Sequence, residues 1–108
     1  QEKAIQWAND RNIFENSDAT KQISKTQEEL DETLDALKKL DLYKKSDNQL
    51  IRSEIMNEVA DGIGDMLVTI ILLAKMVDLD TVDCLAAAYD EIKDRKGKMV
   101  DGLFVKEK

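Results

Sequence analysis

The chain of 108 residues contains no proline, and its apolar residues recur at every third or fourth position. Proline interrupts helices, and this spacing places side chains on one face of a helix, so the pattern favours an all-α fold over strands. We predict a single domain, residues 1–108, with a four-helix bundle-type fold. The helices are expected at about residues 3–13, 19–42, 48–77 and 81–96, with a linker at 43–47.

Short polar residues and glycine mark the ends of these helices. Ser17 or Asp18 can cap the second helix, and Asp80 can cap the fourth. Gly97 is placed to end the fourth helix in a left-handed turn. We expect the tail from Lys98 onward to be irregular or extended.

The two long helices each carry an apolar stripe. The stripe of the second helix lies nearly opposite its acidic side chains and consists of Ile23, Leu30, Leu34 and Leu37. The stripe of the third consists of Ile55, Val59, Ile63, Met66, Ile70 and Ala74. From Met66 to Val77 the third helix is apolar on nearly every side, and such a helix must be enclosed. Three other helices do not suffice in so short a chain, so we predict a homo-oligomer, a dimer or a tetramer.

The composition excludes several classes of function. Without histidine there is no histidine base and no histidine-containing zinc site, and the lone Cys84, among small apolar residues, is expected to be buried and unreactive. The net charge of -7 disfavours binding to nucleic acid. The longest apolar stretch is too short to span a membrane, and the first residues show no secretory signal, so we expect a cytoplasmic protein.

Acidic residues repeat at helical spacing on both long helices. Glu28 and Glu32 fall about 40° apart on the second helix, and Glu58, Asp61 and Asp65 share an arc of about 60° on the third. Such faces are usually solvated surface. If the two faces meet, their carboxylates need a cation between them, and an all-oxygen cluster suits Mg²⁺ or Mn²⁺.

Gly62 and Gly64 lie within this acidic stretch. Each glycine destabilises a helix interior by about 1 kcal/mol relative to alanine, so the pair predicts a close approach by another helix or by a ligand. Ordinary tight packing between helices would explain them equally well.

Three motifs together resemble the MazG-like nucleotide pyrophosphohydrolases of the all-α NTP pyrophosphatase superfamily. They are, in chain order, Lys25-x-x-Glu28-Glu29-x-x-Glu32, Glu58-x-x-Asp61-x-x-Gly64-Asp65, and the run from Tyr89 to Lys98. The resemblance covers nearly the whole chain. Each motif is weak alone, and their order and spacing make the set more specific.

The resemblance implies a helical bundle that oligomerises and binds Mg²⁺ through paired acidic motifs. By position, Glu29 and Glu32 match the first motif, with Glu28 as an additional acid, and Asp65 closes the second. The glutamate expected three residues before Asp65 is replaced by Gly62. The second motif can therefore be aligned in two ways, ending at Asp65 or as Glu58-x-x-Asp61. We favour Asp61 and Asp65 as the metal-ligand pair, with Glu58 as the next candidate.

The implied reaction is hydrolysis of a nucleoside triphosphate to the monophosphate and pyrophosphate, as in removal of unwanted nucleotides. Glu28 or Glu29 would act as the catalytic base, and Lys25, Lys93 and Lys96 would contact phosphates. Trp7 can stack on the base, although burial of its ring against the bundle, with Ile5 and Ile13, is the better explanation. The alternative is a noncatalytic helical oligomer that acts as an interaction or regulatory module.

Overall fold

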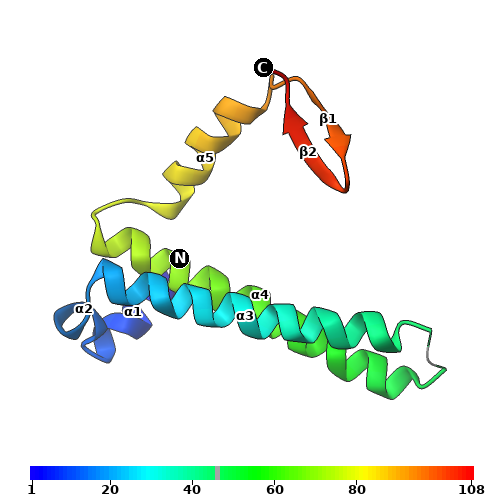
Figure 1. Cartoon of the computed structure of the whole chain (residues 1–108). Coiled ribbons are helices and arrows are strands. Elements are labelled where there is room, and N and C mark those ends of the chain that lie inside the picture. Colours follow the sequence, from blue (N-terminus) through cyan, green and yellow to red (C-terminus); the bar gives the residue numbers. More distant parts are fainter. Residues whose placement is uncertain (46) are drawn as a thin grey trace.

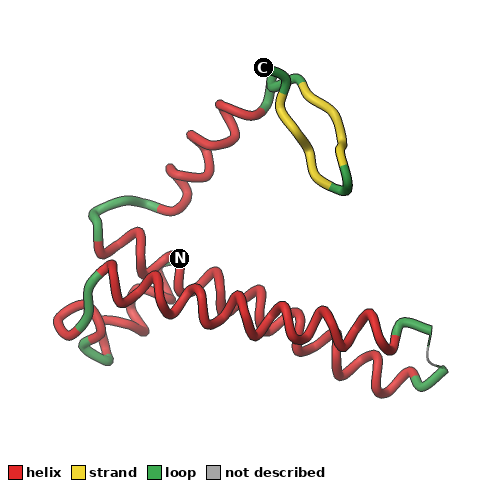
Figure 2. The backbone as a smooth tube through the Cα atoms, viewed as in Figure 1, coloured by secondary structure: helices red, strands yellow, loops and turns green. Residues whose placement is uncertain are grey.

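The computed structural model describes residues 1–45 and 47–108, and they are mostly helical (Figure 1 and Figure 2). These residues form, in chain order, α1 (Glu2–Asp10), α2 (Ile13–Asn16), α3 (Ala19–Tyr43), α4 (Gln49–Met76), α5 (Thr81–Ile92), β1 (Gly97–Val100) and β2 (Leu103–Lys106). The all-α prediction is confirmed at this level, with one small sheet added. The predicted linker at 43–47 includes residue 46, which lies outside the described residues.

The two long helices begin and end close to their predicted positions. Of the two predicted caps, Asp18 is the one used: its side chain accepts a hydrogen bond of 2.9 Å from the backbone N–H of Lys21. Asn48 caps α4 in the same way, with a bond of 3.1 Å from the N–H of Ile51. Side-chain oxygens at these positions satisfy backbone donors that the first helical turn leaves unpaired.

The first predicted helix is wrong beyond Asp10. Asn12 adopts a left-handed backbone conformation with φ of 57°, which ends α1 and separates it from the short α2. Asparagine tolerates this conformation better than most residues. The predicted helix at 3–13 therefore becomes two helices that turn the chain back toward α3.

The fourth predicted helix is also too long, since α5 ends at Ile92. Gly97 does not end it but begins β1, which pairs antiparallel with β2 so that Met99 faces Phe104. Asp101 and Gly102 connect the strands with φ of 50° and 81°. Two positive φ values are typical of a tight hairpin turn, and Asp-Gly is a preferred sequence for it. The extended part of the prediction for the tail is confirmed.

Helices α3 and α4 form an antiparallel pair that provides most of the buried core (Figure 1). The buried side chains of the pair are Gln22, Glu29, Thr33 and Ala36 on α3, and Ile55, Val59, Thr69 and Leu72 on α4. Gly62 allows this approach, because a Cβ at residue 62 would overlap Thr33 Oγ1. At Gly64, by contrast, an added Cβ would meet nothing within 4 Å. The expected close approach by a helix is thus found at Gly62 alone.

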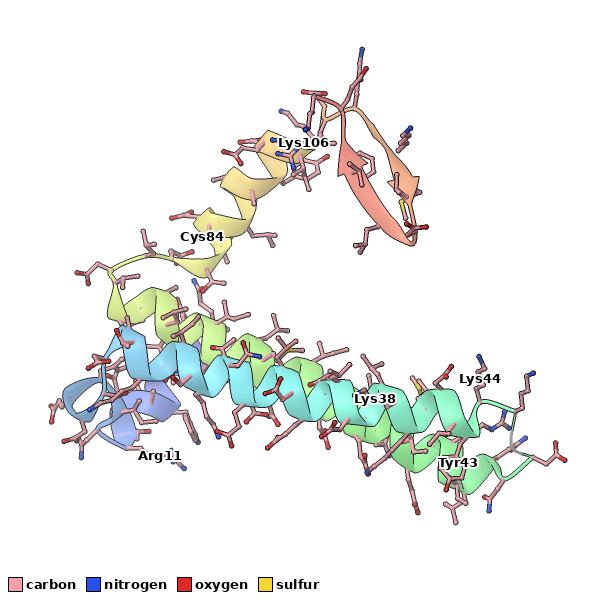
Figure 3. The ribbon with its side chains drawn as sticks, in the orientation of Figure 1. Arg11, Lys38, Tyr43, Lys44, Cys84 and Lys106 are labelled. Atoms are coloured by element: carbon pink, nitrogen blue, oxygen red, sulfur yellow. The ribbon has the colours of Figure 1, made fainter. Side chains whose placement is uncertain are left out.

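Two predictions of burial are wrong within the single chain. The predicted stripe on α3, represented by Leu30 and Leu34, is about half exposed, and the buried side chains of α3 each lie one position before a stripe residue. Cys84 is exposed on α5, where Figure 3 shows it on the segment that leaves the helical pair. None of the helices in the described residues is both long and apolar enough to cross a membrane.

Candidate functional site

The pair of long helices has two flanks of opposite character. At about 100° per residue, the predicted stripe of α3 lies on one side of the contact with α4, and its acidic side chains lie on the other. An ion pair of 3.2 Å between Lys39 on α3 and Glu58 on α4 shows that the acidic sides of both helices face the same way. We call this side the acidic flank, formed by Glu28, Glu32, Glu58, Asp61 and Asp65. The opposite side is the apolar flank, formed by Ile23, Leu30, Leu34, Leu37, Met56, Ile63, Leu67 and Ile70.

A pocket of about 490 Å³ opens on the acidic flank, where α1 packs against α4 and α2 contributes Ile13 to the lining. Ligand pockets commonly have volumes of about 300–1,000 Å³ and combine apolar walls with a few polar groups. This pocket has that composition. Its charged lining consists of Lys25, Glu29 and Asp65, and its apolar lining includes Trp7, Ile13, Val68 and Leu72.

Glu29 is the buried acid of this site, with 9% of its surface exposed. A buried carboxylate is unfavourable unless it is paired. The ammonium of Lys25 provides a partner, 3.4 Å from Glu29 and 3.4 Å from Glu28. The hydrogen bond and charge of Glu28 raise the pKa of Lys25, and Glu29 adds to this effect. Lys25 therefore stays charged at the mouth of the pocket.

Glu32 lies next in this row of carboxylates, one turn beyond Glu28. The negative charge of Glu29 is the main cause that raises the pKa of Glu32, followed by partial loss of solvation and a hydrogen bond to Glu29. Their carboxylates are therefore close enough to repel each other. A positive ion bound between them would relieve this repulsion.

The acids of α4 are divided between two environments. Asp65 borders the same pocket as Glu29. Asp61 is exposed one turn before it, and Glu58 is engaged by Lys39. The alignment of the second motif that ends at Asp65 therefore brings a carboxylate to the pocket. In the other alignment, Glu58 is paired with Lys39. Gly62, where a glutamate was expected, faces Thr33 between the helices and cannot carry a side chain toward the pocket.

The implied metal can be tested against these residues. In the part of the chain that the structure describes, no three acidic or thiol side chains gather closely enough, as placed, to hold a metal ion. The chemistry of the donors nevertheless fits Mg²⁺, since all are carboxylate oxygens and the Glu29–Glu32 pair is under mutual repulsion. Glu29 and Glu32 would hold such an ion, and Asp65 lies at the same pocket as Glu29.

Trp7 forms part of the apolar wall and is still 45% exposed. The guanidinium of Arg11 lies over its ring, 4.5 Å from the ring centroid. The Trp7 ring is therefore partly buried and still lines the pocket, together with Ile13.

Lys93 and Lys96 lie outside this pocket. Lys93 forms an exposed ion pair of 3.6 Å with Asp90 of its own helix, and Lys96 precedes β1. Figure 1 shows this part of the chain standing away from α3 and α4. Within one chain, the structure therefore does not bring these two lysines together with Lys25, Glu29 and Asp65.

Several pocket residues were not identified from the sequence. Gln22 is buried and donates a hydrogen bond of 3.0 Å from Nε2 to the carbonyl of Thr69, which joins α3 to α4 beside the pocket. Gln22 lies two turns before Glu29 on the same face, and this polar spacing was the available signal. Val68 and Leu72 lie in the stretch from Met66 to Val77, which is apolar on nearly every side, so the sequence pattern does not show that they line a pocket.

Comparison with known proteins adds no relative: the chain matches no protein-family model, no curated protein and no solved structure.

Proposed function

We propose that this protein is a Mg²⁺-dependent nucleoside triphosphate pyrophosphohydrolase that acts as a homo-oligomer. The observation that carries the proposal is the pocket on the acidic flank, which combines Glu29, Asp65 and Lys25 with an apolar wall that includes Trp7. These groups suit the two halves of a nucleotide: the charged residues suit its phosphates, and the aromatic ring suits its base. The resemblance of the motifs to MazG-like enzymes supports the same function.

In the proposed reaction, water attacks the α-phosphorus and the bond to the bridging oxygen of pyrophosphate breaks. The proton of the attacking water passes to a carboxylate, Glu28 or Glu29, of which Glu29 lines the pocket. Bound Mg²⁺ would neutralise charge on the phosphate oxygens, which a protein of net charge -7 otherwise repels. Lys25 adds a positive charge on the protein side.

The oligomer is proposed because of the apolar flank. Its eight large apolar side chains are each 38–53% exposed in the single chain. A continuous apolar surface of this kind is typical of an interface. If two copies meet through this flank, their four long helices form a bundle, and both acidic flanks remain open to substrate.

The proposal is tested by measuring pyrophosphate release from a panel of standard and modified deoxynucleoside triphosphates with Mg²⁺. Glu32→Gln and Asp65→Asn are each expected to reduce turnover by roughly 100-fold or more, because a bound metal ion supplies several kcal/mol of charge stabilisation in the transition state and each variant removes a proposed ligand. Asp31→Asn is the matched control, because Asp31 is exposed next to Glu32 and lies on the side of α3 opposite α4. The control is expected to keep the activity of the unmodified chain.

The noncatalytic helical oligomer is the second candidate, and the observation that favours it is Gly62 at the position where the resemblance expects a glutamate. The two candidates differ in their response to Mg²⁺ alone. An enzyme of the proposed kind is stabilised by Mg²⁺, and Glu32→Gln removes this stabilisation. Lack of turnover on every nucleotide, together with an unchanged melting temperature in Mg²⁺, would leave the interaction module as the better explanation.

A further inference from the structure

The C-terminal arm, residues 81–108, comprises α5, β1 and β2 and extends away from the two long helices (Figure 1 and Figure 3). One stripe of α5 is apolar and is 51–70% exposed; its members are Val82, Leu85, Tyr89 and Ile92. The hairpin of β1 and β2 exposes further apolar side chains. An isolated two-stranded hairpin is only marginally stable in water, so the arm needs a surface to cover it.

Hydrogen bonds at the base of the arm fix its direction. Asp78 has a left-handed φ of 59°, and the N–H of Leu79 donates a bond of 2.8 Å to the carbonyl of Ala74. Asp80 then caps α5 and also accepts a bond of 2.6 Å from the side chain of Gln1. The arm is therefore directed away from its own helical pair by a defined turn.

The exposed area is larger than one ordinary contact would cover. The radius of gyration is 17.4 Å, where a compact chain of this length has about 13 Å. The accessible surface is 8625 Å², where a folded monomer of 12.3 kDa exposes about 6,100 Å². The excess is about 2,500 Å² per chain, and a standard interface buries only about 800 Å² on each partner. Contact through the apolar flank alone would leave much of this excess on the arm.

The charges of the chain favour a second copy as the partner. Residues 93–108 contain six basic and three acidic side chains, a net charge of +3. Because the whole chain carries -7, residues 1–92 carry -10. The whole arm, residues 81–108, is neutral because it has six basic and six acidic side chains, and residues 1–80 carry -7. The positive end of the arm is complementary to the negative body of another molecule of the same kind, and such complementarity fixes orientation in an interface.

We propose that two copies exchange their arms, so that the apolar stripe of α5 packs on the α3–α4 pair of the other copy. The basic end of each arm then lies toward the acidic body of its partner. This inference rests on the oligomer in the proposed function and adds which segment crosses between copies. Domain exchange of this kind conserves contacts that a closed monomer would make within one chain.

The test uses the full chain and its single native thiol. Cys84 is exposed on the side of α5 away from the apolar stripe, so a benzophenone maleimide attached there leaves the stripe intact. Labelled chains are mixed with chains enriched in ¹⁵N, irradiated and analysed by mass spectrometry. Cross-linked peptides that join labelled Cys84 to ¹⁵N peptides of α3 or α4 are expected. Cross-links confined to one isotope, or to α4 of the same chain, would overturn the proposal.

A pair of variants provides an independent measurement. Leu85→Lys places a charge within the stripe, and Ala87→Lys places one on the opposite side of α5. Only Leu85→Lys is expected to abolish the cross-links between copies and to reduce the mass measured by light scattering. Equal behaviour of both variants would contradict arm exchange. Pyrophosphate release from a chain whose arm cross-links only to itself would refute arm exchange and leave the proposed enzymatic function intact.

Discussion

Gly62 is the position at which a single methyl group should have the largest effect on the helical pair. A Cβ at residue 62 would overlap Thr33 Oγ1 and would lie 3.1 Å from Thr33 Cβ and 3.3 Å from Thr33 Cγ2. Ordinary contact begins at 3.4 Å. Rotation of the Thr33 side chain moves Oγ1 but leaves Cβ in place, so the two helices must separate.

The expected magnitude follows from two opposing effects. Overpacking in a core destabilises by about 1–3 kcal/mol, and the upper end applies here because both backbones must shift. Replacement of glycine by alanine within a helix stabilises by about 1 kcal/mol. Gly62→Ala should therefore lower the free energy of unfolding by about 2 kcal/mol. For a domain of this size, each kcal/mol lowers the melting temperature by roughly 4–8 °C.

Urea and thermal unfolding at one fixed chain concentration measure this change, because oligomers gain stability with concentration. Gly64→Ala is the matched control: nothing lies within 4 Å of its added Cβ, so it should stabilise by up to about 1 kcal/mol. Thr33→Ala in the Gly62→Ala background removes Oγ1 and Cγ2 but keeps the Cβ at 3.1 Å, so it should recover only part of the loss. If Gly62→Ala is as stable as the unmodified chain, the close contact between α3 and α4 is incorrect.

Three further predictions concern the flanks and the caps. Leu30→Lys charges the apolar flank and should reduce the mass measured by light scattering toward that of one chain. Ser24→Lys, on the outer face of α3, should leave the mass unchanged. Equal masses for the two variants would refute an interface at this flank. The pKa of Glu32 is raised in the folded state, chiefly by the charge of Glu29, so ionisation of Glu32 disfavours folding. Glu32→Gln should therefore be more stable than the unmodified chain at neutral pH, and this gain should vanish as the pH falls below 4.5. A gain that persists in acid would exclude this cause. Asp18→Ala should lower the free energy of unfolding by about 1 kcal/mol and Asp18→Asn by much less, as followed by urea unfolding; equal losses would show that the cap to Lys21 is not responsible.

The sequence was most informative where local chemistry decides the structure. The absence of proline and the helical spacing predicted α3 and α4 almost to the residue, because capping side chains such as Asp18 act within one turn. The same local rules could have identified the hairpin, since Asp101-Gly102 between apolar residues is a recognised turn signal. The left-handed Asn12 was harder to predict, because asparagine disfavours a helix interior by less than about 1 kcal/mol.

The candidate site was predicted only in part for a related reason. Periodicity placed Glu28, Glu32 and Asp65 on particular helix faces, and the structure puts Glu29 and Asp65 at one pocket. Periodicity does not show which face of α3 meets α4, so the burial of Glu29 and the exposure of Leu30 were not foreseen. That choice depends on a long-range fit between two helices.

The sequence by itself determined the class of structure, the boundaries of the two long helices and the acidic chemistry available to the chain, since each depends on neighbours within a few residues. Only the tertiary structure decided how α3 is rotated against α4. Gly62 and Thr33 set the distance between the two helices. This packing places the pocket on the acidic flank and leaves the apolar flank exposed in the single chain. Burial and exposure are properties of contacts between residues far apart in the chain, and no local pattern specifies them.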